Sequence, residues 1–138
     1  MYEKIAEEIR RISDKYGIIY ALLFGSSIDG YMLRSSDIDI AVMLKEDPKN
    51  FGENLRISVK ISSILGRSLG REVDIIILNT APLGLKYEIY TTGKILFCSD
   101  RERFIDDLVK TIGMYQDFRI FISPLYRKLV EKYEGKYD

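Results

Sequence analysis

Three aspartates and a Gly-Ser dipeptide are the residues of this chain whose types and spacing could do chemistry. Asp37 and Asp39 open an apolar run, and Gly25-Ser26 closes the apolar run before it. In a β-strand, alternate side chains point the same way, so Asp37 and Asp39 would project from one face about 7 Å apart. Two neighbouring carboxylates repel each other unless a cation lies between them. The pair is therefore a candidate site for an oxygen-seeking divalent ion such as Mg²⁺.

The Gly25-Ser26 turn is a candidate phosphate-binding element. Gly25 permits a tight turn and a close approach by another group. Ser26 and the amides after it can begin a short helix or turn whose free N–H groups attract an anion. Ten residues separate Ser26 from Asp37, which lets the second strand return beside the first. A phosphate site beside paired carboxylates suits metal-dependent phosphoryl or nucleotidyl transfer. The alternative is a solvated turn with acidic residues at a strand mouth.

Asp74 is the candidate for a third carboxylate. It lies in a run of valine and isoleucine, where an acidic side chain is costly unless it has a purpose. If this run pairs next to the strand of Asp37 and Asp39, the three carboxylates converge on a site for two ions. We expect Asp37 and Asp39 to hold both ions, and Asp74 to bind one and accept a proton from the attacking hydroxyl. The alternative is a strand-end carboxylate paired with Arg71 or Lys94.

The composition favours a globular domain and excludes several kinds of site. The chain has 138 residues, of which 46% are hydrophobic and 30% charged, and this suits one domain over residues 1–138. The absence of histidine excludes His-based general base catalysis and His-ligated zinc. Cys98 is the only cysteine, which excludes an intramolecular disulfide and a cysteine-rich zinc site. Any metal must therefore be held by carboxylates, carbonyls and water.

The charge balance and hydropathy bear on partners and location. Basic and acidic residues both number 21, so the formal net charge is zero, which argues against general binding to nucleic acid or an anionic membrane. No apolar stretch approaches the roughly 20 residues that span a bilayer, and no signal-peptide pattern opens the chain. We expect a soluble cytoplasmic protein.

Hydrophobic periodicity predicts a small α/β domain with a mostly buried sheet. Gly17 and Gly70 are expected to end helices, Asn50 and Ser99 to cap helix starts, and Pro124 to break or kink the last helix near residue 123. Residues 1–98 form the predicted α/β core, and residues 99–138 the C-terminal helical segment. The predicted helices cover residues 2–16, 50–69, 82–91 and 99 almost to the end, and the predicted strands cover residues 18–24, 38–44, 72–78 and 94–98.

The motif Leu23-Phe24-Gly25-Ser26, followed after ten residues by Asp37-Ile38-Asp39-Ile40, resembles the signature of the DNA polymerase beta–type nucleotidyltransferase superfamily. The size of the chain and its Val73-Asp74-Ile75 resemble the minimal nucleotidyltransferase (MNT) branch. The resemblance implies a small mixed β-sheet with flanking helices, the palm-like fold of that superfamily. It also implies Mg²⁺-dependent transfer of a nucleoside monophosphate, usually from ATP. The triphosphate would bind at Gly25 and Ser26, and the metal at Asp37, Asp39 and Asp74.

The loop after Gly-Ser departs from the family pattern. Members often carry a basic or small residue there, whereas this chain has Ser27-Ile28-Asp29. An acidic side chain at position 29 is unfavourable near a triphosphate unless it points away. Arg34 is either the compensating positive charge or a solvated loop residue.

MNT proteins of this size resemble antitoxins that act with a separate HEPN ribonuclease toxin. The resemblance implies that the chain either holds the toxin or transfers AMP to one of its tyrosines. The aromatic-rich stretch at residues 114–121 has apolar residues on more than one side, consistent with a contact surface or with a helix packed on its own sheet. Three hypotheses follow: an enzyme that modifies a partner protein, a non-catalytic module that neutralises a toxin by contact, or a small-molecule nucleotidyltransferase that acts as an oligomer.

Overall fold

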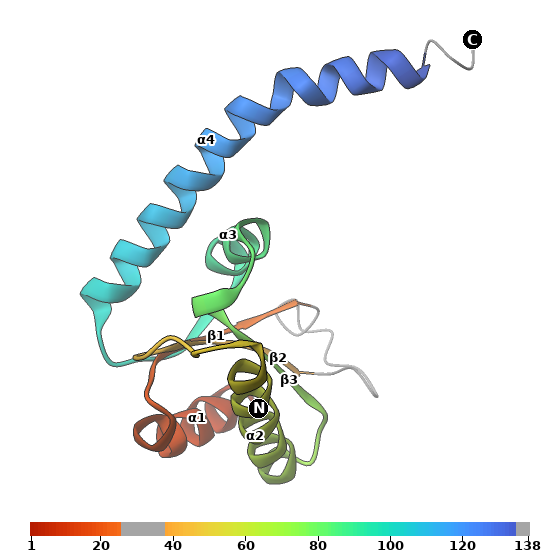
Figure 1. Cartoon of the computed structure of the whole chain (residues 1–138). Coiled ribbons are helices and arrows are strands. Elements are labelled where there is room, and N and C mark those ends of the chain that lie inside the picture. Colours follow the sequence, from red (N-terminus) through yellow and green to blue (C-terminus); the bar gives the residue numbers. More distant parts are fainter. Residues whose placement is uncertain (26–37, 135–138) are drawn as a thin grey trace.

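A four-stranded sheet organises the part of the chain that the computed structural model describes, residues 1–25 and 38–134 (Figure 1). The strand order is β3-β2-β1-β4. β1 runs antiparallel to β2 and β4, whereas β2 and β3 are parallel, so the sheet is mixed, as predicted. The strands are β1 (Ile18–Phe24), β2 (Ile38–Leu44), β3 (Val73–Ile77) and β4 (Lys94–Cys98).

The helices lie on both faces of this sheet. α1 and α2 cover one face, α3 and the first turns of α4 lie on the other, and the rest of α4 projects away from the domain (Figure 1). The helices are α1 (Tyr2–Tyr16), α2 (Phe51–Leu69), α3 (Leu83–Thr92) and α4 (Arg101–Glu134), and a short 3₁₀ turn, η2 (Leu78–Thr80), follows β3.

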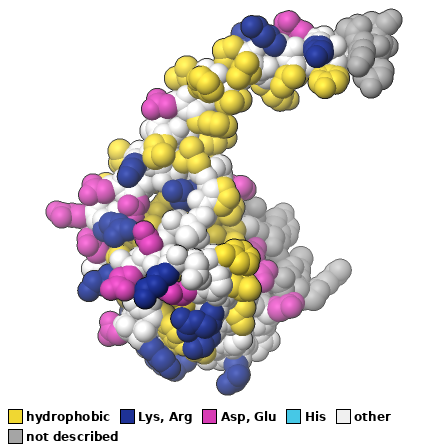
Figure 2. All heavy atoms as spheres, in the orientation of Figure 1, with side chains coloured by type: hydrophobic (Ala, Val, Ile, Leu, Met, Phe, Trp, Pro, Cys, Tyr) yellow, Lys and Arg dark blue, Asp and Glu magenta, His cyan; other side chains and the backbone are white. Residues whose placement is uncertain are grey.

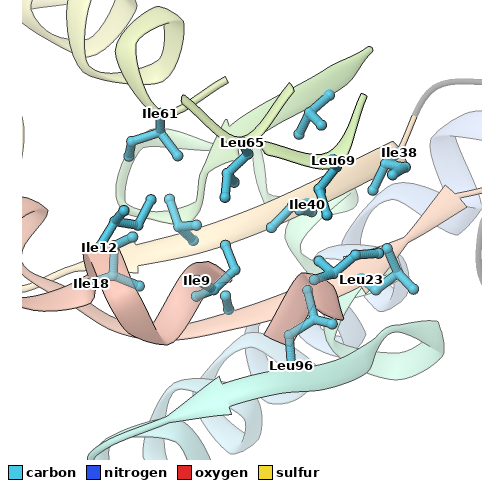
Figure 3. Close-up of a cluster of buried hydrophobic side chains, with 14 of the residues drawn as sticks. Ile9, Ile12, Ile18, Leu23, Ile38, Ile40, Ile61, Leu65, Leu69 and Leu96 are labelled. Carbon is cyan, nitrogen blue, oxygen red and sulfur yellow. The ribbon is translucent and has the colours of Figure 1, made fainter. Parts of the chain in front are cut away.

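Alternation along the strands builds a core on each face of the sheet. Ile38 and Ile40 of β2 pack with Ile9 of α1 and Leu65 of α2, as Figure 3 shows. On the other face Tyr20 of β1 joins a second cluster of buried side chains from α3 and α4. Burial of both faces explains why the strands are nearly continuous apolar runs. The second cluster comprises Tyr20, Leu22, Ala41, Met43, Leu78, Ile89, Tyr90 and Phe104.

Three of the predicted helix ends are confirmed. Gly17 and Gly70 follow α1 and α2 with φ of 66° at both, the left-handed conformation that glycine adopts readily. Asn50 caps α2, because its Oδ1 accepts a hydrogen bond of 2.8 Å from the backbone N–H of Glu53.

One expectation about the last helix is wrong and another is only partly met. Asp100, not Ser99, caps the start of α4: its Oδ1 accepts from the backbone N–H of Arg103 at 3.0 Å, while the Ser99 hydroxyl donates to the carbonyl of Ile19. Of the break or kink expected at Pro124, the break does not occur, because α4 continues through Pro124 to Glu134, although the helix bends along its outer part (Figure 1). Proline removes one backbone hydrogen bond, and the helix tolerates this loss at an exposed position.

Across residues 1–25 and 38–134, no helix combines the length and apolar character that crossing a bilayer requires.

Candidate active site

Asp39 and Asp74 lie directly opposite each other on neighbouring parallel strands. They are register partners of β2 and β3, whose backbones are about 4.8 Å apart in a sheet of this kind. Ile38 and Val73, the residues just before them, are buried in the core beneath α1 and α2. Since successive side chains of a strand alternate, both carboxylates project from the opposite face of the sheet. The predicted proximity of these two aspartates is confirmed.

Gly25 packs its backbone against the Asp39 carboxylate. The last residue of β1, Phe24, is the register partner of Asp39 on the antiparallel side. Gly25 then turns with φ of 75°, a conformation that L residues rarely adopt. A Cβ at this position would collide with Oδ2 of Asp39. Only glycine therefore lets the chain turn here without displacing the carboxylate.

The donor set suits a hard cation such as Mg²⁺. Asp39 is half-buried and Asp74 is exposed, so a hydrated ion can reach both, and carboxylate oxygens are its preferred protein ligands. Among the described residues no group of three or more His, Cys, Asp or Glu side chains could hold a metal. The predicted third ligand, Asp37, lies outside those residues, as do Ser26 and residues 27–36.

The alternative explanation for Asp74, a strand-end ion pair, is not found. Within residues 1–25 and 38–134, Asp74 forms no ion pair with Arg71 or Lys94. Asp74 is thus an exposed carboxylate opposite Asp39 with no ion-pair partner among the described residues, which leaves it available to a bound cation.

A second polar cluster on the same face of the sheet was not predicted. The Tyr20 hydroxyl donates to Oδ2 of Asp107 at 2.7 Å and lies 2.5 Å from the Tyr90 hydroxyl. Arg103 Nε donates to the same Asp107 oxygen at 2.9 Å. Burial raises the pKa of Tyr90 to about 12 and raises the pKa of Tyr20 further. The two phenols stay protonated at neutral pH, and the hydrogen bonds of the cluster join β1, α3 and α4.

This cluster was missed because it depends on packing between distant segments. Tyr20 precedes Tyr90 by 70 residues and Asp107 by 87 residues. The one signal in the sequence was a hydroxyl-bearing Tyr20 inside an otherwise apolar strand, because a buried phenol needs a hydrogen-bond partner.

Comparison with known proteins identifies the family. A model of the family described as polymerase beta, nucleotidyltransferase matches residues 7–102. The chain belongs to this nucleotidyltransferase family. Protein adenylyltransferase MntA of Shewanella oneidensis is 35% identical to it over 115 residues, which are 82% of this chain and 76% of that protein.

Solved structures with the same fold come from toxin–antitoxin complexes. A chain from a crystal structure of a toxin–antitoxin with AMP-PNP is 27% identical, with a TM-score of 0.74, and the match covers 91% of this chain and 98% of that one. A chain from the tri-AMPylated Shewanella oneidensis HEPN toxin in complex with its MNT antitoxin has a TM-score of 0.71 at 24% identity. That match covers 94% of this nucleotidyltransferase and 99% of the other chain, and it shows likeness of fold alone.

Proposed function

We propose that this nucleotidyltransferase is a protein adenylyltransferase antitoxin that moves AMP from ATP to a hydroxyl of a HEPN ribonuclease toxin in the cytoplasm. The observation that carries the proposal is the Asp39–Asp74 pair, together with the Gly25 backbone that packs against the Asp39 carboxylate. The 35% identity to a protein adenylyltransferase supports AMP transfer. The likeness to a toxin–antitoxin chain crystallised with an ATP analogue supports ATP and a toxin as the two substrates.

The two described aspartates have distinct roles in this proposal. Asp39, with Asp37, would hold Mg²⁺ against the triphosphate, which binds along Gly25 and Ser26. Bound Mg²⁺ neutralises charge on the phosphates and assists the departure of pyrophosphate. Asp74 would bind one of the two ions and accept the proton of the attacking hydroxyl. The hydroxyl oxygen bonds to the α-phosphorus, the bond to the β-phosphate oxygen breaks, and pyrophosphate leaves.

The projecting part of α4 is the surface that we assign to the toxin. Beyond Tyr115, whose ring stacks on Tyr87 of α3 at 4.0 Å, large apolar side chains remain exposed along the helix (Figure 2). A run of exposed apolar residues on one helix is typical of a protein-binding surface. The exposed side chains there are Phe118, Ile120, Phe121, Leu125, Tyr126, Leu129 and Tyr133.

Radiolabelled ATP tests the activity. The wild-type chain is incubated with ATP labelled on the α-phosphate, Mg²⁺ and a purified HEPN protein as the candidate acceptor, and the label is followed into the HEPN protein. We expect transfer by the wild type, loss of transfer in Asp39→Asn, and full transfer in Asp14→Asn, whose side chain is exposed on α1. Transfer that persists in Asp39→Asn would refute the assigned site.

The same assay separates the alternative hypotheses. If the HEPN protein binds and is inhibited but takes up no label, the chain is a non-catalytic antitoxin. If the HEPN protein neither binds nor is labelled while a small hydroxyl compound accepts AMP, the chain is a small-molecule nucleotidyltransferase.

A further inference from the structure

A polar cavity lies between α3 and α4, away from the aspartate pair. Its volume is about 210 Å³, and Met43 and Leu78 are among the apolar residues that line it. Met43 follows Asp39 by four residues on the same strand, a separation of about 13 Å. The cavity is therefore at the opposite end of the sheet from Gly25, and the proposed adenylyl transfer does not use it.

Three cationic side chains line this cavity, and their charged ends are poorly satisfied. Arg103 is anchored through Nε to Asp107, and among the described residues the hydrogen bond that its Nη2 donates goes to the sulfur of Met43 at 3.6 Å, a weak acceptor. Lys86 of α3 and Lys110 of α4 also line the cavity. Neither lysine forms an ion pair within residues 1–25 and 38–134.

The two carboxylates of the lining already have donors. Oδ2 of Asp107 accepts from Arg103 and from the Tyr20 hydroxyl. Oδ1 of Asp47 accepts from Nδ2 of Asn79 at 2.8 Å. The lining therefore combines three cationic side chains with two carboxylates, and it carries a net positive charge that an anionic ligand can neutralise.

Thr111 supplies the second and independent observation. The residue as a whole is only 4% exposed and lines the cavity, and its hydroxyl forms no hydrogen bond in the described part of the chain. The hydroxyl is not among the polar atoms closed off from solvent, so what remains accessible of this side chain opens into the cavity. A hydroxyl in this position is a ready donor to an anion in the cavity.

We propose that this cavity binds the phosphate group of a small ligand. The oxygens of one phosphate group can between them accept hydrogen bonds from Arg103, Lys86, Lys110 and the Thr111 hydroxyl, and charge-assisted bonds of this kind are the strong ones. The cavity is smaller than the roughly 300–1,000 Å³ of pockets that enclose whole drug-sized molecules. The ligand is thus free phosphate or pyrophosphate, or the phosphate end of a larger molecule that extends outside.

Isothermal titration calorimetry in EDTA tests the proposal, because chelation removes divalent ions from the carboxylate site. The probes are inorganic phosphate, pyrophosphate and AMP. The test variant combines Lys86→Met with Lys110→Met, and the matched control combines Lys49→Met with Lys60→Met, which are exposed elsewhere. Thr111→Val, which keeps the shape of the side chain, tests the contribution of the Thr111 hydroxyl separately.

We expect saturable binding of one or more probes to the wild type and the control. The Lys86/Lys110 variant should raise Kd at least about tenfold, and Thr111→Val about threefold or more. Tighter binding of AMP than of phosphate would identify a phosphomonoester as the ligand, and the reverse order a free anion. No saturable binding of any probe, or equal binding by the Lys86/Lys110 variant and its control, would overturn the proposal.

Discussion

Replacing Gly25 by alanine tests the close contact between the turn and the Asp39 carboxylate. Gly70→Ala is the matched control, because Gly70 has φ of 66° against 75° at Gly25. A Cβ at Gly70 meets nothing within 4 Å, whereas one at Gly25 collides with Oδ2 of Asp39. The two variants share the cost of a left-handed alanine and differ in what the new methyl group touches.

The structure sets the expected magnitudes. A left-handed L residue costs roughly 1–2 kcal/mol, so both variants should lose about that much free energy of unfolding. To reach ordinary van der Waals separation, the Asp39 carboxylate must move by about 1 Å in Gly25→Ala. A displacement of that size in a catalytic group costs on the order of 10²-fold in rate.

Urea unfolding and the labelled-ATP assay measure the two effects separately. We expect similar unfolding midpoints for Gly25→Ala and Gly70→Ala, with near-normal AMP transfer by Gly70→Ala and about a hundredfold loss in Gly25→Ala. A higher Mg²⁺ requirement should accompany the loss, since the displaced carboxylate is a proposed ligand. Equal transfer rates in the two variants would refute the role of Gly25 in positioning Asp39.

Four further predictions concern Asp74, the buried tyrosines and α4. Asp74→Asn should reduce AMP transfer at least about 10²-fold with unchanged circular dichroism, and a normal rate would exclude it as the proton acceptor. Tyr20→Phe should lower the free energy of unfolding by about 1.5–3 kcal/mol in urea, because Asp107 loses a hydrogen bond to its carboxylate. Burial raises the pKa of Tyr90 to about 12, so the Tyr90 phenol loses its proton at a lower pH in the unfolded chain than in the folded one. The free energy of unfolding should therefore fall as the pH rises from about 10 to 12. A fall of equal size in Tyr90→Phe would contradict this. Phe121→Asp should abolish co-purification with the toxin and Arg127→Asp should not; co-purification of both would move the docking surface elsewhere.

Much of the fold could be predicted from local patterns in the sequence. The central strands β1 and β2 are buried on both faces, so each appears as a nearly continuous apolar run, and glycine or asparagine marks three helix ends directly. The carboxylate pair could also be predicted, because Asp39 and Asp74 interrupt such runs at the ends of strands. The sequence does not show whether the strands of Asp39 and Asp74 are neighbours, and the structure shows that β2 and β3 are a parallel pair.

The features that could not be predicted depend on contacts between distant segments. Ser99 and Asp100 are both good caps, and the pairing of Ser99 with Ile19 of β1 decided between them. Pro124 indicated a break or kink because proline lacks a backbone N–H and its ring crowds the preceding turn, and the sequence alone does not show that the helix continues through it to Glu134. The hydrogen bond from the Tyr20 phenol to Asp107 exists only because α4 packs against the sheet, and no local pattern shows this packing.

The projecting part of α4 has a consequence for how the protein behaves without its partner. About 19 residues beyond Tyr115 extend roughly 28 Å, and an isolated helix of this length is marginal in water. In the free protein its amide hydrogens should exchange much faster than those of α1 or α2, and a bound partner should slow them. Because this segment contributes little to the core, its sequence can change to fit another partner while the sheet and its aspartates stay as they are.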